Sequence, residues 1–347
     1  MKPRIFRHFS AIRALLGIAS FCLIIGGLKV AKVILIPFLL AALISLACSY
    51  PLIWLLRKGV PKLIAIPLVM ILLVVVFSGM ALLLTRSLNE FTHAMPNFRQ
   101  RFIGVIDKVG EFASQFGIDP SKIDLFQPLK SGAIIEMFGH LLSGLVGAFS
   151  LILLITFLVI FMLFEAVGFK SKLKNAFGGE IDITNLDAVV LDLQSYLGIK
   201  TFTSFLTGGS IWILLYFFAI DFAALWGLIA FFLNYIPVIG SIVASLPAIM
   251  FAFVQYGPQS AVIIAICYIV INVLISNMIE PFLMGNRLGL SPLVVFMSIA
   301  FWGWLWGPAG MLMSVPLTMI IKILLEHSKE LQWIADLMGA PRDPGSN

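Results

Sequence analysis

The segment "LIAIPLVMILLVVVFSGMALLLT", residues 63–85, is a run of 23 residues without a charged side chain. About 20 apolar residues in a helix are enough to cross the hydrocarbon core of a membrane. Comparable, largely apolar runs occur at Ala11–Leu28 and Ala261–Ile279. Because lipid offers no hydrogen-bond partners to the backbone, several such runs predict a bundle of membrane helices.

The composition of the whole chain agrees with a membrane protein. Of its 347 residues, 61% are hydrophobic and 12% are charged, and the mean hydropathy is +1.06. Soluble domains have about 25% charged residues. The net charge of +6 is typical of positively charged cytoplasmic loops, so we expect the lipid bilayer, and no nucleic acid, as a partner.

The positions of the apolar runs predict the fold class. Single membrane-spanning helices are expected at 11–28, 31–56, 62–85, 149–167, 203–220 and 260–280. Two further apolar regions, 222–255 and 292–325, are broken in the middle, so each either crosses twice or is re-entrant. The prediction is an all-α, polytopic helical membrane protein with two broken or re-entrant apolar regions and a small amphipathic helical insertion.

The insertion follows the third predicted span. Within it, apolar residues recur every three or four positions, as in an amphipathic helix: Phe98, Phe102, Val105, Val109, Phe112 and Phe116. The chain is therefore divided into N-terminal transmembrane helices (1–85), the amphipathic helical insertion (86–148), a transmembrane helix (149–167), an amphipathic linker (168–200), a C-terminal transmembrane transport region (201–326) and a tail (327–347).

Basic residues predict the orientation of these parts. They precede the first span and follow the second and fourth spans, in three clusters: Lys2, Arg4, Arg7 and Arg13; Arg57, Lys58 and Lys62; Lys170, Lys172 and Lys174. Cytoplasmic loops of membrane proteins carry the excess of lysine and arginine. We therefore expect cytoplasmic N- and C-termini, an extracytoplasmic insertion and a cytoplasmic linker.

Common catalytic motifs are absent from the sequence. It contains no GxxxxGK[ST] nucleotide loop, no HExxH metal pair and no GxSxG nucleophile elbow, and its four histidines are scattered. The three cysteines lie inside apolar segments without metal-binding spacing. We therefore expect no enzyme activity, no cofactor and no metal site.

The two broken regions contain similar interruptions. In "LNYIPVIGSIVASLP", residues 233–247, Pro237 and Gly240 prevent a continuous helix, and in "WGWLWGPAGMLMSVP", residues 302–316, Pro308 and Gly310 do the same. Paired, interrupted apolar segments indicate the substrate region of a transporter. The alternative is a pair of tight loops between ordinary short helices at the membrane surface.

Polar residues also occur at regular spacing in the span before the second broken region. Tyr268, Asn272, Ser276 and Glu280 are four residues apart, and such a stripe usually faces a bundle interior or a cavity. We predict that a substrate path is formed by Asn234, Tyr268, Asn272 and Ser276. The alternative is hydrogen bonding that only holds helices together.

Glu280 has a separate interpretation because it comes at the end of its helix, where the helix dipole disfavours an anion. Arg287 follows after a proline and a glycine and is the expected counter-charge, with no nearer candidate. We predict that Glu280 and Arg287 form a gate or loop pair.

The motifs "NYIPVIGS" (234–241) and "NMIEPFLMGNRLGLSPLVVFMSIAFWGWLWGPAGMLMSVPLT" (277–318) closely resemble the autoinducer-2 exporter family of bacterial membrane proteins. The resemblance is strongest over 200–326 and covers most of the chain. It implies a bacterial inner-membrane protein that exports the quorum-sensing signal autoinducer-2, a small polar solute. It also implies a homo-oligomer, with a pentamer as one arrangement.

Three functions remain open at this point. The first is export of autoinducer-2 or a similar small polar solute, without ATP hydrolysis by this chain. The second is sodium(lithium)/proton antiport, because some members of the family resemble cation/proton antiporters. The third is a membrane scaffold that transports nothing.

Overall fold

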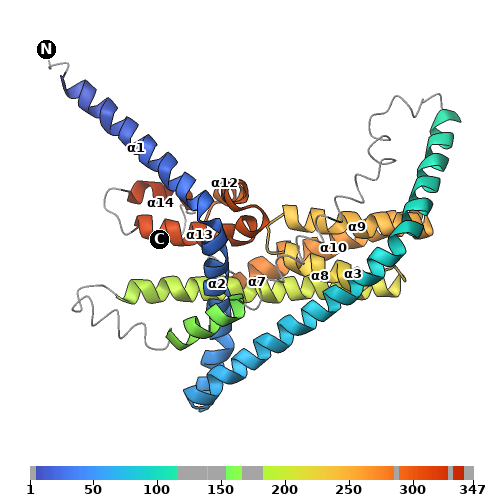
Figure 1. The fold of residues 1–347 in the computed structure, drawn as a ribbon, viewed down its shortest axis with the longest axis horizontal. Helices are drawn as coiled ribbons and strands as arrows, with labels where there is room; N and C mark the ends of the chain where they lie inside the picture. The colour runs from blue at the N-terminus through green and yellow to red at the C-terminus, as the bar shows by residue number, and fades with distance from the viewer. Residues whose placement is uncertain are drawn as a thin grey trace. The chain divides into compact units, whose positions relative to one another are not determined.

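The computed structural model describes residues 5–115, 139, 154–165, 183–284, 289–326 and 331–339. Every regular element within these ranges is a helix (Figure 1). The all-α prediction is therefore confirmed. In order, the labelled helices are α1 (Ile5–Val30), α2 (Lys32–Arg57), α3 (Lys62–Gln115), α7 (Ile183–Phe217), α8 (Ala223–Leu233), α9 (Ile239–Tyr256), α10 (Pro258–Asn272), the π-helix η2 (Val273–Ile279), α11 (Glu280–Met284), α12 (Pro292–Trp306), α13 (Pro308–Glu326) and α14 (Gln332–Met338).

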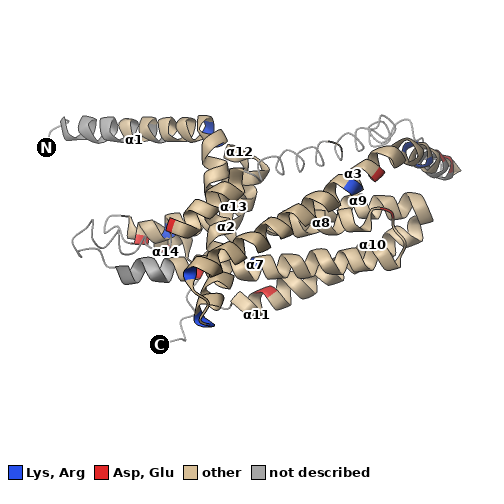
Figure 2. Ribbon diagram, turned by 60° about the horizontal axis from the view of Figure 1, so that its bottom comes forward, with Lys and Arg blue, Asp and Glu red and all other residues tan. Residues whose placement is uncertain are grey.

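Five helical segments within the described ranges are long and apolar enough to cross a membrane, which confirms a polytopic membrane protein. They are Lys32–Arg57, Lys62–Val105, Ile239–Tyr256, Pro258–Met284 and Pro308–Glu326. Figure 2 shows that α9 and α10 carry no charged residue along their whole length. Helices α8 and α12 are apolar but shorter, with 11 and 15 residues.

The chain divides into two compact units that alternate along the sequence. Unit 1 contains Met1–Leu46, Glu165–Leu193 and Leu288–Asn347, and unit 2 contains Ala47–Phe164 and Gln194–Arg287. The predicted membrane boundaries, which were derived from hydropathy and charge, divide the chain differently and stay predictions.

Unit 1 contains the second broken region as a helical hairpin. Helix α12 ends at Trp306, Gly307 has a positive φ of 68°, and Pro308 begins α13. A Cβ atom on Gly310 would lie only 2.0 Å from the carbonyl oxygen of Trp302, so only glycine allows α13 to begin this close to α12. The apolar region is therefore interrupted, as predicted, and the interruption is a tight turn between two helices.

Unit 2 contains the first broken region, which is also a hairpin. Helix α8 ends at Leu233 and α9 begins at Ile239, with Pro237 between them. A Cβ atom on Gly240 would lie 1.7 Å from the carbonyl oxygen of Leu233, which repeats the close approach seen at Gly310. The similar spacing of proline and glycine in the two regions thus has the same physical basis. In each hairpin, the first turn of the second helix packs against the carbonyl group of a residue near the end of the first.

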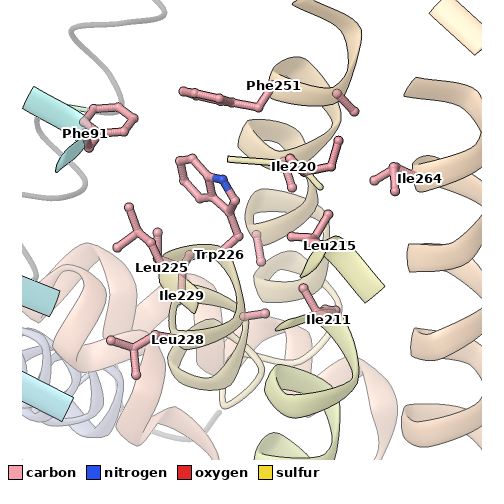
Figure 3. Close-up of a cluster of buried hydrophobic side chains, with 14 of the residues drawn as sticks. Phe91, Ile211, Leu215, Ile220, Leu225, Trp226, Leu228, Ile229, Phe251 and Ile264 are labelled. Atoms are coloured by element: carbon pink, nitrogen blue, oxygen red, sulfur yellow. The ribbon is translucent and has the colours of Figure 1, made fainter. Parts of the chain in front are cut away.

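The core of unit 2 combines aliphatic and aromatic side chains around Trp226 of α8 (Figure 3). Trp226 is fully buried, and its ring centroid lies 5.3 Å from that of Phe251 on α9 and 6.1 Å from that of Phe91 on α3. Its indole nitrogen donates a hydrogen bond to the carbonyl oxygen of Asp221. This core holds the α8–α9 hairpin against α3.

Helices α3 and α7 are each longer than a membrane span. The 54-residue helix α3 continues from the predicted span through residue 85 into the predicted amphipathic helix, and Phe98 stacks on Phe251 at 4.0 Å. The predicted apolar face of this part is buried at Phe98 and Phe102. Helix α7 likewise joins the amphipathic stretch before residue 200 to the predicted span at 203–220. Residues 116–138 and 140–148 of the predicted insertion lie outside the described ranges.

Candidate functional site

Helix α7 presents a buried polar face inside unit 2. One side of the helix carries Lys200, followed three and four residues later by Thr203 and Ser204, and then by Thr207, which is four residues after Thr203 and three after Ser204. Their exposed fractions are only 3%, 0%, 0% and 1%. Polar groups in a membrane helix are costly unless they have partners, so this face requires polar groups opposite it.

A buried ion pair is the strongest interaction of this face. The Nζ atom of Lys200 donates hydrogen bonds to both carboxylate oxygens of Glu280, at 2.8 and 3.0 Å. The Thr203 hydroxyl lies 3.3 Å from Oε2 of the same carboxylate. The two charged side chains are 4% and 15% exposed. Each charge is therefore neutralised by the other where water has little access.

The break between α8 and α9 supplies the next partners. The side-chain amide of Asn234, which is 4% exposed, donates a 3.0 Å hydrogen bond to Ser204 Oγ. The hydroxyl of Tyr235 donates a 2.8 Å hydrogen bond to Thr201 Oγ1. Both residues directly follow the end of α8, so the interruption of the helix brings them to α7. The polar cluster consists of Lys200, Thr201, Thr203, Ser204, Asn234, Tyr235 and Glu280.

The remaining member of the cluster, Glu280, begins α11, which continues α10 and η2 as one helical rod over Pro258–Met284. In an α-helix a step of four residues exceeds one turn by about 40°, so three steps from Tyr268 to Glu280 would drift by about 120°. Residues Val273–Ile279 form a π-helix, which has a wider turn of about 4.4 residues. The wider turn removes most of the drift, so Tyr268 and Glu280 face the same side.

The contacts of this rod show that it runs antiparallel to α7. Glu280, near its end, contacts Lys200, whereas Ile264, near its beginning, lies in the same buried cluster as Leu215 (Figure 3). The residue numbers rise along one helix as they fall along the other. Tyr268 belongs to that cluster too and is 1% exposed.

Two atoms on this rod are buried without a hydrogen-bond partner among the described residues. They are the hydroxyl oxygen of Tyr268 and the Oδ1 atom of Asn272. The two residues are four positions apart in α10, and Asn272 directly precedes the π-helix. Because almost all buried polar atoms in proteins are paired, two neighbouring unpaired atoms require an explanation.

The structure therefore brings some of the predicted residues together. Asn234 and Glu280 both reach the polar cluster on α7, and Tyr268 and Asn272 lie on the rod that ends at Glu280. Ser276 is half-buried within the π-helix. Pro308 and Gly310 belong to the hairpin in unit 1, whereas Pro237 and Gly240 belong to unit 2.

The expectation that Glu280 has no candidate counter-charge nearer than Arg287 was wrong. Its carboxylate has a close counter-charge, Lys200, which lies 80 residues earlier in the chain. Arg287 lies outside the described residues, so a Glu280–Arg287 pair stays a prediction. The signal that could have identified Lys200 was present, because Tyr196, Lys200, Thr203 and Thr207 have helical spacing. Because the predicted span began at residue 203, Lys200 was assigned to the preceding linker and was not counted in this pattern.

The hairpin of unit 1 also contains a polar network, but all of its described members have partners. The Ser298 and Thr318 hydroxyl oxygens are 2.6 Å apart, and the Trp302 indole donates a 3.2 Å hydrogen bond to Thr318. The indole of Trp306 donates to the carbonyl oxygen of Leu28 on α1. These interactions join α12 to α13 and to α1, and a structural role accounts for them.

The comparison with known proteins assigns the chain to a family. The sequence profile described as AI-2E family transporter matches residues 18–330. The chain belongs to this family. The resemblance seen in the sequence is thus confirmed, and the chain is a member of a family of multi-pass membrane transporters rather than of enzymes.

Relatives of the AI-2E family match the chain over nearly its whole length. AI-2 transport protein TqsA of Escherichia coli (strain K12) is 34% identical over 330 residues, covering 95% of this chain and 96% of TqsA. A putative transport protein of Haemophilus influenzae is 38% identical over 341 residues, covering 95% and 97%. Putative transport protein YhhT of Escherichia coli (strain K12) is 32% identical over 334 residues, covering 96% of each chain.

Proposed function

We propose that this transporter exports autoinducer-2, or a closely similar small polar solute, across the bacterial inner membrane without hydrolysing ATP itself. The relative TqsA, whose name specifies AI-2 transport, is 34% identical to the chain. A polar solute needs hydrogen-bond partners in place of water while it is inside the bilayer. Amide and hydroxyl groups provide such partners without the cost of burying an unpaired charge.

The observation that carries the proposal is the position of Asn234. It lies at the end of α8, where the helix is interrupted, and it contacts the buried polar face of α7. Interrupted helices at membrane depth are typical of transporter substrate sites, because the freed backbone groups there can face a polar cavity. The proposed path contains Asn234, Tyr268, Asn272 and Ser276.

The proposal includes an orientation. Glu280 lies 22 residues after the start of α10 at Pro258, about 33 Å along the axis at 1.5 Å per residue. The ion pair is therefore near one end of the span, and the positive-inside rule makes that end cytoplasmic. Both termini would then be cytoplasmic. A homo-oligomer, with a pentamer as one arrangement, is also part of the proposal.

Export is tested by measuring the signal inside and outside bacteria. Deleting the gene should raise intracellular autoinducer-2, and the wild-type gene should restore the normal level. Asn234→Ala should fail to restore it while the protein remains in the membrane. Asn277→Ala is the matched control, because Asn277 is exposed and lies outside the proposed path. An unchanged intracellular level in the deletion strain would refute export.

Sodium(lithium)/proton antiport is the second candidate, and the buried carboxylate of Glu280 is the observation in its favour. Because Lys200 already neutralises this carboxylate, a sodium ion would have to displace the lysine. Export of a neutral solute requires no such displacement. Purified protein in liposomes distinguishes the two, since only an antiporter would move protons when sodium is added.

A further inference from the structure

The register of the two facing helices places a polar side chain of α7 opposite one of the two unpaired atoms of α10. Antiparallel packing with Glu280 opposite Lys200 places Asn272 at the level of Thr207, because each lies about two turns from the ion pair, in opposite chain directions. By the same register, Tyr268 lies at the level of Ile211, one turn further on. Polar groups thus lie on both sides of the seam between α7 and the α10–η2–α11 rod, in the apolar interior of unit 2.

Three oxygen atoms of this seam can accept further hydrogen bonds, namely Asn272 Oδ1, the Tyr268 hydroxyl and the Thr207 hydroxyl. Asn272 Oδ1 can only accept, and the Thr207 hydroxyl already donates its proton to the carbonyl oxygen of Thr203 at 2.9 Å. The Tyr268 hydroxyl can donate one hydrogen bond and accept another. A solute that forms hydrogen bonds with these oxygen atoms must therefore carry hydrogen-bond donors, and hydroxyl groups are suitable donors.

The lack of a free counter-charge in this seam further limits which solutes can bind there. The polar cluster described above contains a single cation, Lys200, whose Nζ atom is committed to both oxygens of Glu280. No described residue at the level of Tyr268 and Asn272 on either helix is charged, since α10, η2 and the part of α7 that follows Lys200 contain no charged residue. The Asn272 amide nitrogen and the Tyr268 hydroxyl could donate hydrogen bonds to an anion there, but no free counter-charge would neutralise it, so its burial would be unfavourable.

We infer that Tyr268 and Asn272, with Thr207 opposite them, form the selective subsite of the transport path, which takes a neutral solute bearing several hydroxyl groups and rejects its anionic derivatives. This inference rests on the proposed function and assigns the substrate class of the same path. The unpaired atoms are explained as groups that the solute satisfies during transit.

Binding to the purified full-length protein in lipid nanodiscs tests the inference. The probe is 1,4-anhydroribitol, a neutral tetrahydrofuran with three hydroxyl groups, and the comparison compound is its 5-phosphate. Saturation-transfer NMR should detect the neutral probe and not the phosphate. Tyr268→Phe and Asn272→Leu should each lower the signal of the neutral probe about fivefold, which is the loss expected for one hydrogen bond.

Matched controls keep the test specific. Tyr216→Phe and Asn277→Leu make the same chemical changes at exposed positions of unit 2 and should leave the signal unchanged. Tyr268→Phe keeps the buried ring and removes an oxygen atom that has no partner among the described residues, so this variant should fold as well as the wild type.

The outcomes separate this inference from the proposed function. No signal from the neutral probe, an equal signal from the phosphate, or unchanged signals in both path variants would overturn the inference. Unchanged binding in Tyr268→Phe would indicate that ordered water alone occupies the position. If the probe binds as expected and the deletion strain still has a normal autoinducer-2 level, the proposed export function is refuted and the inferred subsite for a neutral solute is supported.

Discussion

The buried pair Lys200–Glu280 allows a quantitative test of how unit 2 is held together. At 2.8 Å and an effective dielectric constant of about 20, the attraction between the two charges is about 6 kcal/mol. Removing two ions from water costs several kcal/mol each, so the pair as a whole contributes little net stability. Losing one partner is different, because it leaves the other charge buried and unpaired. That loss costs about 3–5 kcal/mol.

We therefore expect Lys200→Met and Glu280→Gln each to lower the free energy of unfolding by about 3–5 kcal/mol. The double variant Lys200→Met/Glu280→Leu, which fills both positions with apolar side chains, should be within about 2 kcal/mol of the wild type. Unfolding of the purified proteins in mixed micelles with increasing SDS measures these differences. A double variant that is destabilised by the sum of the two single changes would refute the reasoning.

The same experiment compares Lys200 with Arg287 as the partner of Glu280. Because both carboxylate oxygens of Glu280 already accept hydrogen bonds from Lys200, Arg287→Gln should change the free energy of unfolding by no more than about 1 kcal/mol. If Arg287→Gln is as destabilising as Lys200→Met, the sequence-based gate pair is the better description.

Three further predictions concern the hairpins and the topology. Gly240→Ala should destabilise the protein by about 3 kcal/mol or more, because the new Cβ atom would overlap a backbone carbonyl group. The destabilisation is measured as a smaller amount of folded protein on size-exclusion chromatography. Gly310→Ala should have the same effect for the same reason, whereas Gly209→Ala, which meets no atom within 4 Å, is the control and should be neutral. Cysteines replacing Ser121 and Ser171, in a background without native cysteines, should react with an impermeant reagent from opposite sides of the membrane. Labelling of both from the outside would disprove the predicted orientation.

The helix breaks could be predicted from the sequence because their causes are local. Proline lacks the amide hydrogen that a continuous helix needs, and the glycines at 240 and 310 allow backbone contacts that any side chain would prevent. Both effects act within a few residues of the chain. The amphipathic face at Phe98 and Phe102 was predictable for the same reason, since its spacing repeats with the helical turn.

The polar cluster was only partly predictable because it is formed by residues far apart in the chain. Asn234 and Glu280 could be singled out as polar residues beside helix ends, but their partners Ser204 and Lys200 lie 30 and 80 residues away. A single sequence gives no distances across such separations. The π-helix was missed as well, because Val273–Ile279 contains no proline or glycine that marks a change of helical geometry. Wide turns of this kind depend on the surrounding packing and not on local propensity.

The wide turn at Val273–Ile279 makes the polar face of this span depend on helical geometry as well as on composition. The seven residues of the π-helix advance by about 82° each around the axis, whereas in an ordinary α-helix they would advance by about 100° each. If the segment closed into an ordinary α-helix with no change of sequence, everything after it would turn by about 130° relative to α10. Glu280 would then point away from Lys200, although the span would keep its hydrophobicity and its membrane insertion. Deleting one residue at the same time would bring Glu280 back to within about 30° of its direction. The π-helix therefore determines the direction of Glu280 as directly as the side chains of the site determine its partners.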